Sequence, residues 1–351
     1  MKPELFMCNY YGMCDENGKS VGHTIKVTKE YADLLSGYYN LKLLASPSII
    51  NEIEKEVFSE CVKLRFDISI HGNNISKRIL DKFKLLYNIN QILRRKGIFF
   101  FYQVDFFFFF YMFFLFKKCS EKRVYCLIYH QDFTGGRFES VLKKIYHRAL
   151  SKIDGVIYTQ KSAAIEHNNS LWMPDFLFDK DIYGKYLEME KLSRCVCVGT
   201  MNRYRQLEEL VDVFSEMEMQ LVIVGRFDDK LRYQKLLNRK SENIEIRDGN
   251  ISYSEYLELL GTSRYSILPY DMNQYINRTS GVLLESIYVG CIPIAPKELL
   301  EQNSIPGWGY DSIRDILDED AGLAFGIKEF EGIREKYDKE VFANQLSKWF
   351  S

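Results

Sequence analysis

Short apolar runs alternate along the whole chain with longer runs in which apolar residues recur every three or four positions. The short runs are LFMCNYYG, LKLLAS, IFFFYQV, RVYCLIYH and DGVIYTQ, then CVCVG, LVIVG, IEIRDGN, YSILPY and IPIAP. Strands that alternate with helices are typical of an α/β protein built on parallel sheets. The polar stretch MPDFLFDKDIYGKY, with Pro174 and Gly184, interrupts the alternation once and is the expected linker.

The chain of 351 residues is long enough for two domains that each bury a core. The interruption predicts an N-terminal Rossmann-like domain over residues 1–180 and a C-terminal one over 181–335, facing each other across a cleft. Residues 336–351 end a stretch of charged residues with apolar residues at helical spacing. We expect this last segment to form a helix that packs back on the first domain.

The charge of the chain is balanced, with 47 Lys and Arg residues against 48 Asp and Glu residues. No global field would therefore attract nucleic acid, and any anionic ligand needs a local site. The eight cysteines are scattered, and we expect them to be reduced. Cys195 and Cys197 alternate along one strand and lack a second Cys or His pair at zinc spacing, so we expect no metal site.

The run IFFFYQVDFFFFFYMFFLF, residues 98–116, is long enough to cross a bilayer. Against a spanning helix, Asp105 would lie near the bilayer centre at a cost of about 3 kcal/mol. We favour a strand over Ile98 to Val104 followed by a helix. Five consecutive Phe residues cannot all point into one core, so an exposed aromatic face that docks on a membrane surface is the alternative.

The N-terminus, MKPELFMCNYYG, lacks the basic start and the small-residue cleavage site of a signal peptide. We therefore expect a cytoplasmic protein, which the aromatic run could bring into peripheral contact with the inner face of the membrane.

Ligands of open parallel sheets bind outside the carboxyl ends of the strands. Gly199 ends one strand, and Arg203 and Arg205 follow it just before a helix. Guanidinium groups suit a diphosphate because their planar forks match phosphate oxygens, although both arginines could also lie on a solvated loop. Gly225 and Arg226 repeat this arrangement after the next strand.

Two further strand ends could contact a nucleotide. Gly249, Asn250 and Ile251 follow a third strand and could contact a base edge or form a plain turn. In the segment NRTSGVLLESIYVGCIPIAP, Thr279, Ser280 and Gly281 open a helix, whose free N–H groups and positive dipole end favour a diphosphate.

Glu285 lies four residues beyond Gly281, about one helical turn, and could accept hydrogen bonds from ribose hydroxyls. The alternative for this segment is a helix with an ordinary Thr-Ser cap and a surface acid.

The segment RTSGVLLESIYVGCIPIAP, with YSILPY, CVCVGTMNRYRQLEEL and LVIVG, resembles the donor domain of family-4-type glycosyltransferases over about residues 193–296. Such enzymes have two facing Rossmann-like domains (the B fold, or GT-B) and transfer a sugar from a nucleotide diphosphate sugar to an acceptor. The resemblance implies that Glu285 binds the ribose and that the loop at Gly249 binds the base. It assigns the diphosphate to Arg205 and to residues 279–283, which include Val282.

The chain departs from this family at three positions. Arg205 stands where the family usually has a lysine, and Thr200 where it has an arginine. Asn277, eight positions before Glu285, replaces the first of two glutamates that hold the donor sugar. An amide can hydrogen-bond a hydroxyl but carries no charge, which leaves the donor sugar and the stereochemistry of transfer open.

The first half resembles the family less specifically. The loop SVGHTIK matches a glycine-bearing loop near the acceptor, which makes Gly22 and His23 candidates. The segment YHQDF after RVYCLIYH resembles a strand-end His-Asp pair, so His130 and Asp132 are the candidate catalytic residues, although a structural role for His130 is an open alternative. For the other histidines, at 71, 147 and 167, we expect structural roles.

These patterns predict a hexosyltransferase that uses a nucleotide diphosphate sugar, with UDP-sugar the expected donor, and that needs no further cofactor. We expect the acceptor to be a glycan or a lipid-linked saccharide, in surface polysaccharide or capsule biosynthesis. One alternative is a nucleotide-sugar epimerase or hydrolase. A second is a catalytically silent scaffold of a polysaccharide-assembly complex, and a third is an integral membrane enzyme.

Overall fold

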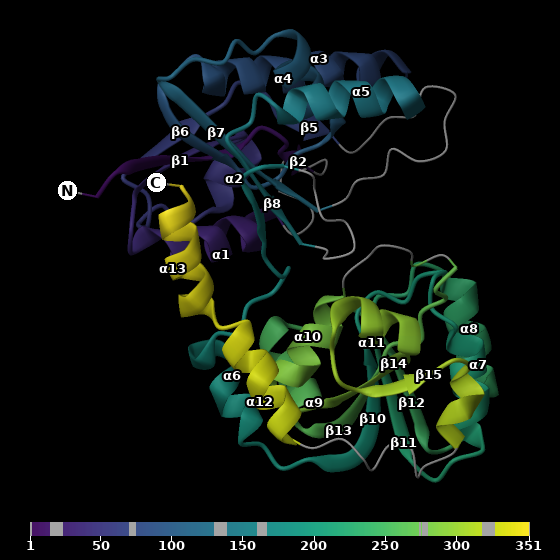
Figure 1. The fold of residues 1–351 in the computed structure, drawn as a ribbon. Helices are drawn as coiled ribbons and strands as arrows, with labels where there is room; N and C mark the ends of the chain where they lie inside the picture. Colours follow the sequence, from purple (N-terminus) through teal and green to yellow (C-terminus); the bar gives the residue numbers. More distant parts are fainter. Residues whose placement is uncertain are drawn as a thin grey trace. The chain divides into compact units, whose positions relative to one another are not determined.

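The chain divides into two compact units, each built on a parallel sheet (Figure 1). The structure, a computed structural model, describes residues 2–14, 24–69, 75–129, 139–159, 167–273, 275, 280–317 and 327–350. Unit 1 comprises Met1–Thr159, Ala163–Met173 and Glu340–Ser351, and unit 2 comprises Gln160–Ser162 and Pro174–Lys339.

The division differs from the one expected at residue 180. The stretch predicted as a linker contains helix α6 (Lys180–Leu187), which the Asp179 side chain caps by accepting a hydrogen bond from the Asp181 amide. Tyr183 and Tyr186 of this helix are buried in unit 2. The linker region therefore belongs to unit 2, whereas the last helix, α13 (Lys339–Trp349), packs with unit 1.

Unit 1 is built on a seven-stranded parallel sheet with the strand order β4-β3-β1-β6-β7-β8-β9. The strands are β1 (Glu4–Asn9), β3 (Asn40–Ala45), β4 (Glu60–Lys63), β6 (Gly97–Phe101), β7 (Lys122–Ile128), β8 (Gly155–Tyr158) and β9 (Ser170–Trp172). Two short strands, β2 (Met13–Cys14) and β5 (Ile68–Ser69), pair separately. The remaining helices are α1 (Thr24–Ser36), α2 (Pro47–Glu52), α3 (Ile75–Leu93), α4 (Phe106–Phe114) and α5 (Glu139–Leu150).

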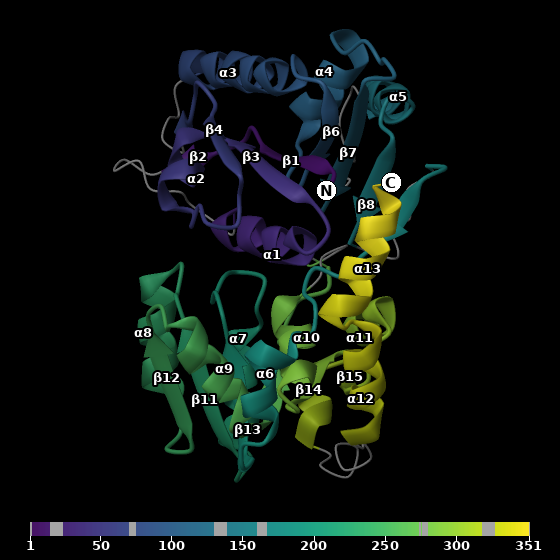
Figure 2. The same ribbon diagram turned by 90° about the vertical axis from the view of Figure 1, so that its left-hand side faces the viewer.

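Both faces of this sheet are covered by helices, with α3, α4 and α5 on one face and α1 and α13 on the other (Figure 2). Strand β6 is continuously apolar because alternate side chains enter the two cores. Phe99 and Phe101 belong to the core under α3 and α4. Phe100 lies between them in sequence and contacts Tyr31 of α1 and Phe350 beside α13.

The Phe-rich segment forms a strand and a separate helix, as predicted. Strand β6 ends at Phe101, earlier than the expected Val104, and α4 begins at Phe106. No helix in the described part of the chain is long and apolar enough to cross a membrane. The side chain of Asp105 accepts hydrogen bonds from the amides of Phe107 and Phe108 and so caps α4.

Asp105 also binds Tyr10 of the strand-end segment after β1. The Tyr10 hydroxyl donates to Asp105 Oδ1 over 2.7 Å and accepts from the Asp105 amide over 2.8 Å. Burial raises the pKa of Asp105, and the hydrogen bond from Tyr10 opposes this rise. One carboxylate thus fixes both the start of α4 and the end of β1.

Replacing Asp105 by alanine is expected to lower the free energy of unfolding by about 2 kcal/mol, since a cap is worth about 1 kcal/mol and a lost partner of a buried hydroxyl about 1–3 kcal/mol. Asp105→Asn keeps an oxygen that can cap the helix, so its free energy of unfolding should fall clearly less than that of Asp105→Ala. Urea unfolding of both variants measures the difference. Equal losses would contradict the capping role.

Unit 2 is built on a six-stranded parallel sheet with the order β12-β11-β10-β13-β14-β15. Its strands are β10 (Leu192–Val198), β11 (Gln220–Gly225), β12 (Ile244–Asp248), β13 (Ser263–Ile267), β14 (Ile292–Pro296) and β15 (Trp308–Tyr310). Its helices, besides α6, are α7 (Leu207–Ser215), α8 (Lys230–Arg239), α9 (Tyr253–Gly261), α10 (Gly281–Tyr288), α11 (Lys297–Asn303), the 3-10 helix η2 (Ile313–Leu317) and α12 (Ile327–Lys336).

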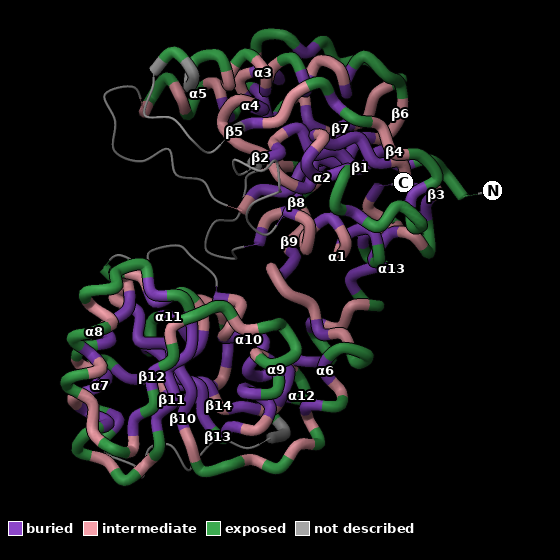
Figure 3. The backbone as a smooth tube through the Cα atoms, turned by 180° about the vertical axis from the view of Figure 1, so that it is seen from behind, coloured by how far each residue is buried: buried purple, intermediate pink, exposed green. Residues whose placement is uncertain are grey.

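The order of the strands in unit 2 reverses between β10 and β13. Strands β11 and β12 follow β10 on one side, and β13, β14 and β15 lie on the other. The central strands are largely buried, with α7 and α8 on one face of the sheet and α9, α10 and α12 on the other (Figure 3). Such a point of reversal is where open α/β sheets bind their ligands.

Candidate nucleotide site of unit 2

Three glycines mark the carboxyl ends of adjacent strands in unit 2. Gly199 follows β10, Gly225 ends β11 and Gly249 follows β12, with φ values of +105°, +158° and +153°. The amide of Gly199 donates to the Val224 carbonyl, and that of Gly249 to the Gly225 carbonyl. A Cβ atom on Gly225 would lie 1.7 Å from the Gly199 carbonyl oxygen, so only glycine allows these two strand ends to lie so close.

The loops after β10 and β13 are joined at the point of reversal. Gln206 donates its amide to the Pro269 carbonyl over 2.7 Å, and Asp271 donates to the Tyr204 carbonyl over 2.9 Å. Between these bonds, Arg205 forms an isolated antiparallel bridge with Tyr270. The two loops therefore hold Arg205 and Tyr270 side by side.

The guanidinium group of Arg205 is buried, with the residue only 4% exposed. It donates to the Val198 carbonyl over 2.9 Å, to Cys197 Sγ over 3.2 Å and to the Tyr270 hydroxyl over 3.3 Å. None of these partners is a carboxylate, and Arg205 Nε has no hydrogen-bond partner in the described part of the chain. A buried cation held by neutral groups is suited to an anionic ligand, because an unpaired buried charge is costly.

The start of α10 lies beside Arg205. The hydroxyls of Tyr270 and Ser280 are 3.3 Å apart, and a Cβ atom on Gly199 would contact both the Arg205 guanidinium and Val282. Ser280 occupies the N-cap position, but its side chain makes no capping hydrogen bond. The positive end of α10 therefore lies near Arg205, and the Ser280 side chain does not cap it.

Gly281 has a packing role. A Cβ atom at this position would lie 2.6 Å from the ring of Phe176, so any larger residue would force the aromatic ring to move. The absence of a side chain at Gly281 therefore has a structural explanation that does not require a phosphate.

Glu285 lies one turn further along α10 and is 4% exposed. Its Oε1 accepts from the Tyr253 hydroxyl and its Oε2 from the Tyr256 hydroxyl, both over 2.7 Å. Tyr183 of α6 is within 3.5 Å of Oε1 and 3.1 Å from the Tyr253 hydroxyl. Burial and the neighbouring Glu285 raise the pKa of Tyr256 well above its usual value, so the phenol remains a proton donor to the carboxylate.

The tyrosines around Glu285 were not predicted. Tyr253 and Tyr256 lie three positions apart at the start of α9, a spacing that places both on one helical face. Nothing in that spacing indicates the partner, which follows about thirty residues later in the chain. Tyr270, which joins Arg205 to Ser280, was likewise not singled out.

The two exposed arginines lie apart from this cluster of contacts. Arg203 is exposed and contacts the Tyr204 ring and hydroxyl, and Arg226 is exposed and pairs with Asp228. Asn250 and Ile251 lie in the loop between β12 and α9, next to Gly249. The structure thus brings Gly199, Arg205, Ser280 and Val282 together. Glu285 lies on the side of α10 that faces α9.

Several predicted residues lie outside the described residues. These are Gly22, His23, His130, Asp132, Asn277 and Thr279. Of the other histidines, His167 contacts the carbonyls of Ile153 and Asn169, which is a structural arrangement.

The cysteines with described side chains are all free. Cys195 and Cys197 belong to the buried core of unit 2. Within the described residues, no group of three or more His, Cys, Asp or Glu side chains could hold a metal ion.

No protein-family model matches the sequence, and no curated protein is similar to it in sequence. Solved structures are similar in fold over the whole chain. An α,α-trehalose-phosphate synthase (UDP-forming) from Burkholderia vietnamiensis has a TM-score of 0.64 at 8% identity, covering 100% of this chain and 99% of that one.

Two further solved structures show the same similarity. Anabaena HepE, in complex with UDP and glucose, has a TM-score of 0.62 at 10% identity, and the match covers 99% of this chain and 98% of that one. AviGT4, a glycosyltransferase involved in avilamycin A biosynthesis, has a TM-score of 0.59 at 9% identity, and the match covers 99% of this chain and 97% of that one. The chain therefore has the GT-B fold of nucleotide-sugar glycosyltransferases, and the predicted fold is confirmed.

Proposed function

We propose that this protein is a glycosyltransferase that transfers a hexose-type sugar from a UDP-sugar to a glycan or lipid-linked acceptor. The observation that carries the proposal is the buried Arg205 guanidinium beside the start of α10, which has no carboxylate partner among the described residues. In glycosyl transfer the leaving diphosphate gains negative charge, and a fixed cation with a helix N-terminus stabilises that charge.

Glu285 supplies the second part of the proposed site. Its carboxylate already accepts two phenolic hydroxyls, and the vicinal hydroxyls of a ribose offer donors of the same chemistry. The loop of Gly249, Asn250 and Ile251 runs directly into α9, whose Tyr253 contacts Glu285, which supports its assignment to the base. UDP and glucose are bound in the HepE structure, and the synthase from B. vietnamiensis is UDP-forming.

The remaining assignments are carried by sequence resemblance. We propose that His130 and Asp132 act at the reacting centre, that Gly22 and His23 lie on the acceptor side, and that Asn277 and Thr279 contact the donor. A role in surface polysaccharide assembly at the cytoplasmic face of the membrane follows from the proposed acceptor class.

UDP is expected to stabilise the protein, because a ligand at 100 times its dissociation constant adds about 2.7 kcal/mol to the free energy of unfolding. Thermal unfolding with UDP, GDP and uridine measures this effect. Uridine lacks the diphosphate and should stabilise far less than UDP. If GDP stabilises the protein and UDP does not, the transferase proposal stands but the donor is a GDP-sugar.

Transfer is expected to survive EDTA, because the proposed clamp for the diphosphate consists of Arg205 and the start of α10. Release of UDP from a panel of UDP-sugars, measured with and without acceptor and with and without EDTA, tests this. Strict dependence on a divalent ion would contradict the clamp. UDP release that is unaffected by any acceptor would favour the alternative, a nucleotide-sugar hydrolase.

A further inference from the structure

Helix α3 carries a stripe of apolar residues on its solvent side. Ile79, Leu80 and Phe83 are 54%, 55% and 65% exposed, and Tyr87, one turn after Phe83, is 41% exposed. The opposite side of the same helix supplies residues to the core of unit 1. A surface helix normally has charged and polar residues on its outer face, so α3 is apolar on two sides.

Helix α4 extends this surface. It contains no charged residue, and its sequence FFFFFYMFF places Phe110 and Phe113 at half-buried positions. Phe114 and Leu115, at the end of the helix, are each 55% exposed. Phe107 and Phe113 are partly buried against the core of unit 1, so Phe114 and Leu115 form the exposed end of this surface.

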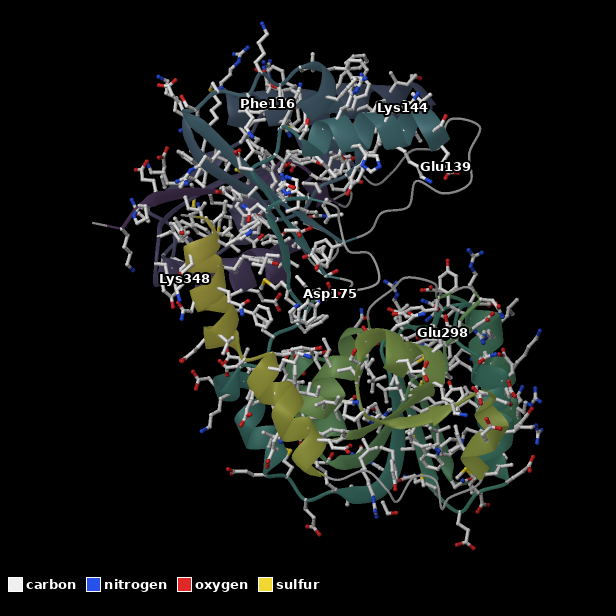
Figure 4. The ribbon with its side chains drawn as sticks, in the orientation of Figure 1. Phe116, Glu139, Lys144, Asp175, Glu298 and Lys348 are labelled. Carbon is white, nitrogen blue, oxygen red and sulfur yellow. The ribbon has the colours of Figure 1, made fainter. Side chains whose placement is uncertain are left out.

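The helices that carry this apolar surface are rich in basic residues. Helices α3, α4 and α5, with the Lys117–Lys118 pair, contain nine Lys or Arg residues and two acidic ones, Asp81 and Glu139, whereas the whole chain has a net charge of −1. Lys143 and Lys144 of α5 are exposed, and Figure 4 shows Lys144 in the same helical layer as the segment that follows α4. Positive charge is therefore concentrated on the part of unit 1 that exposes large apolar side chains.

We propose that the layer formed by α3, α4 and α5 is a docking surface for an anionic lipid membrane. Exposed Phe, Leu and Ile side chains enter the boundary between headgroups and acyl chains, and flanking Lys and Arg residues are attracted to anionic headgroups. A second copy of this chain is a poorer occupant, because the excess of positive charge would face itself. The docking needs neither nucleotide nor transfer, so it stands or fails separately from the proposed function.

The test is sedimentation of the full chain with vesicles of phosphatidylglycerol and phosphatidylcholine, and with vesicles of phosphatidylcholine alone. Binding is expected to be at least tenfold stronger to the anionic vesicles and to weaken at high salt. Phe83→Gln combined with Phe114→Gln should weaken it at least tenfold. Ile79→Gln with Leu80→Gln tests the same stripe if the first pair fails to fold.

Two controls make the outcome specific. Leu231→Gln alters an apolar residue of α8 in unit 2 that is 75% exposed, and should leave vesicle binding unchanged. Lys143→Gln with Lys144→Gln should reduce binding to the anionic vesicles only. Absence of wild-type binding, or an equal loss in Leu231→Gln, would overturn the proposal. So would a lipid-free dimer that the Phe83 and Phe114 changes convert to a monomer, which would assign this surface to a second copy.

Discussion

Replacing Arg205 by alanine is expected to lower the turnover number of sugar transfer by about 10²- to 10³-fold, the usual effect of removing one group that stabilises charge in a transition state. The guanidinium is buried at the carboxyl end of β10, bonded to the Val198 carbonyl and to Tyr270. Its charge acts there with little screening by solvent. The measurement is the rate of UDP release at saturating donor and acceptor.

Two variants show whether the effect belongs to the charge at this position. Arg205→Lys keeps the charge but loses the planar fork, so we expect an intermediate rate. Arg239→Ala removes an exposed arginine of α8 and should leave the rate within about twofold, as for most surface changes. If Arg205→Ala is folded and transfers sugar at the wild-type rate, the diphosphate is bound elsewhere.

Replacing Glu285 by glutamine is expected to weaken UDP binding by about 10- to 100-fold, because a hydrogen bond to a charged group contributes about 1.5–3 kcal/mol. Glutamine retains one oxygen and the size of the side chain, so the contacts with α9 lose less than they would in Glu285→Ala. Calorimetric titration with UDP measures the change. Ribose 5-phosphate lacks the base but keeps the ribose hydroxyls, so Glu285→Gln should bind it more weakly than the wild type does.

The matched control is Tyr253→Phe, which leaves the carboxylate in place and removes the hydroxyl on Oε1. If ribose binds Glu285, this hydroxyl competes with it, and the variant should bind UDP at least as tightly as the wild type. Tyr256→Phe removes the partner of Oε2 and should instead lower stability, by about 1 kcal/mol. Unchanged UDP affinity in Glu285→Gln would contradict the ribose assignment.

The fold could be predicted from the sequence because both sheets are parallel and buried on two faces. Their strands are therefore continuous apolar runs, such as CVCVG and LVIVG, and those runs became β10 and β11. Short edge elements carry no such signal. Strands β4, β9 and β15 were not predicted, since an edge strand of three or four residues is too short to show a pattern.

The candidate site could be predicted only as far as backbone geometry determines it. Gly199, Gly225 and Gly249 were recognisable because strand ends at positive φ require glycine. The environment of Glu285 could not be predicted from the sequence. Three tyrosines reach this residue from α6 and α9, and contacts between helices far apart in the chain depend on tertiary packing. For the same reason, the positions of Arg203 and Arg205 before the helix did not distinguish an exposed arginine from a buried one, and only the resemblance assigned the diphosphate to Arg205.

The last helix has a consequence for how the protein is made. Unit 1 is discontinuous, since it needs residues 340–351 to complete the face of its sheet on which Phe350 contacts Phe100 and Tyr125. During synthesis this helix emerges from the ribosome only after all of unit 2. Unit 1 therefore cannot finish folding before unit 2 has been synthesised, and a fragment that ends near residue 180 would expose those aromatic rings to water.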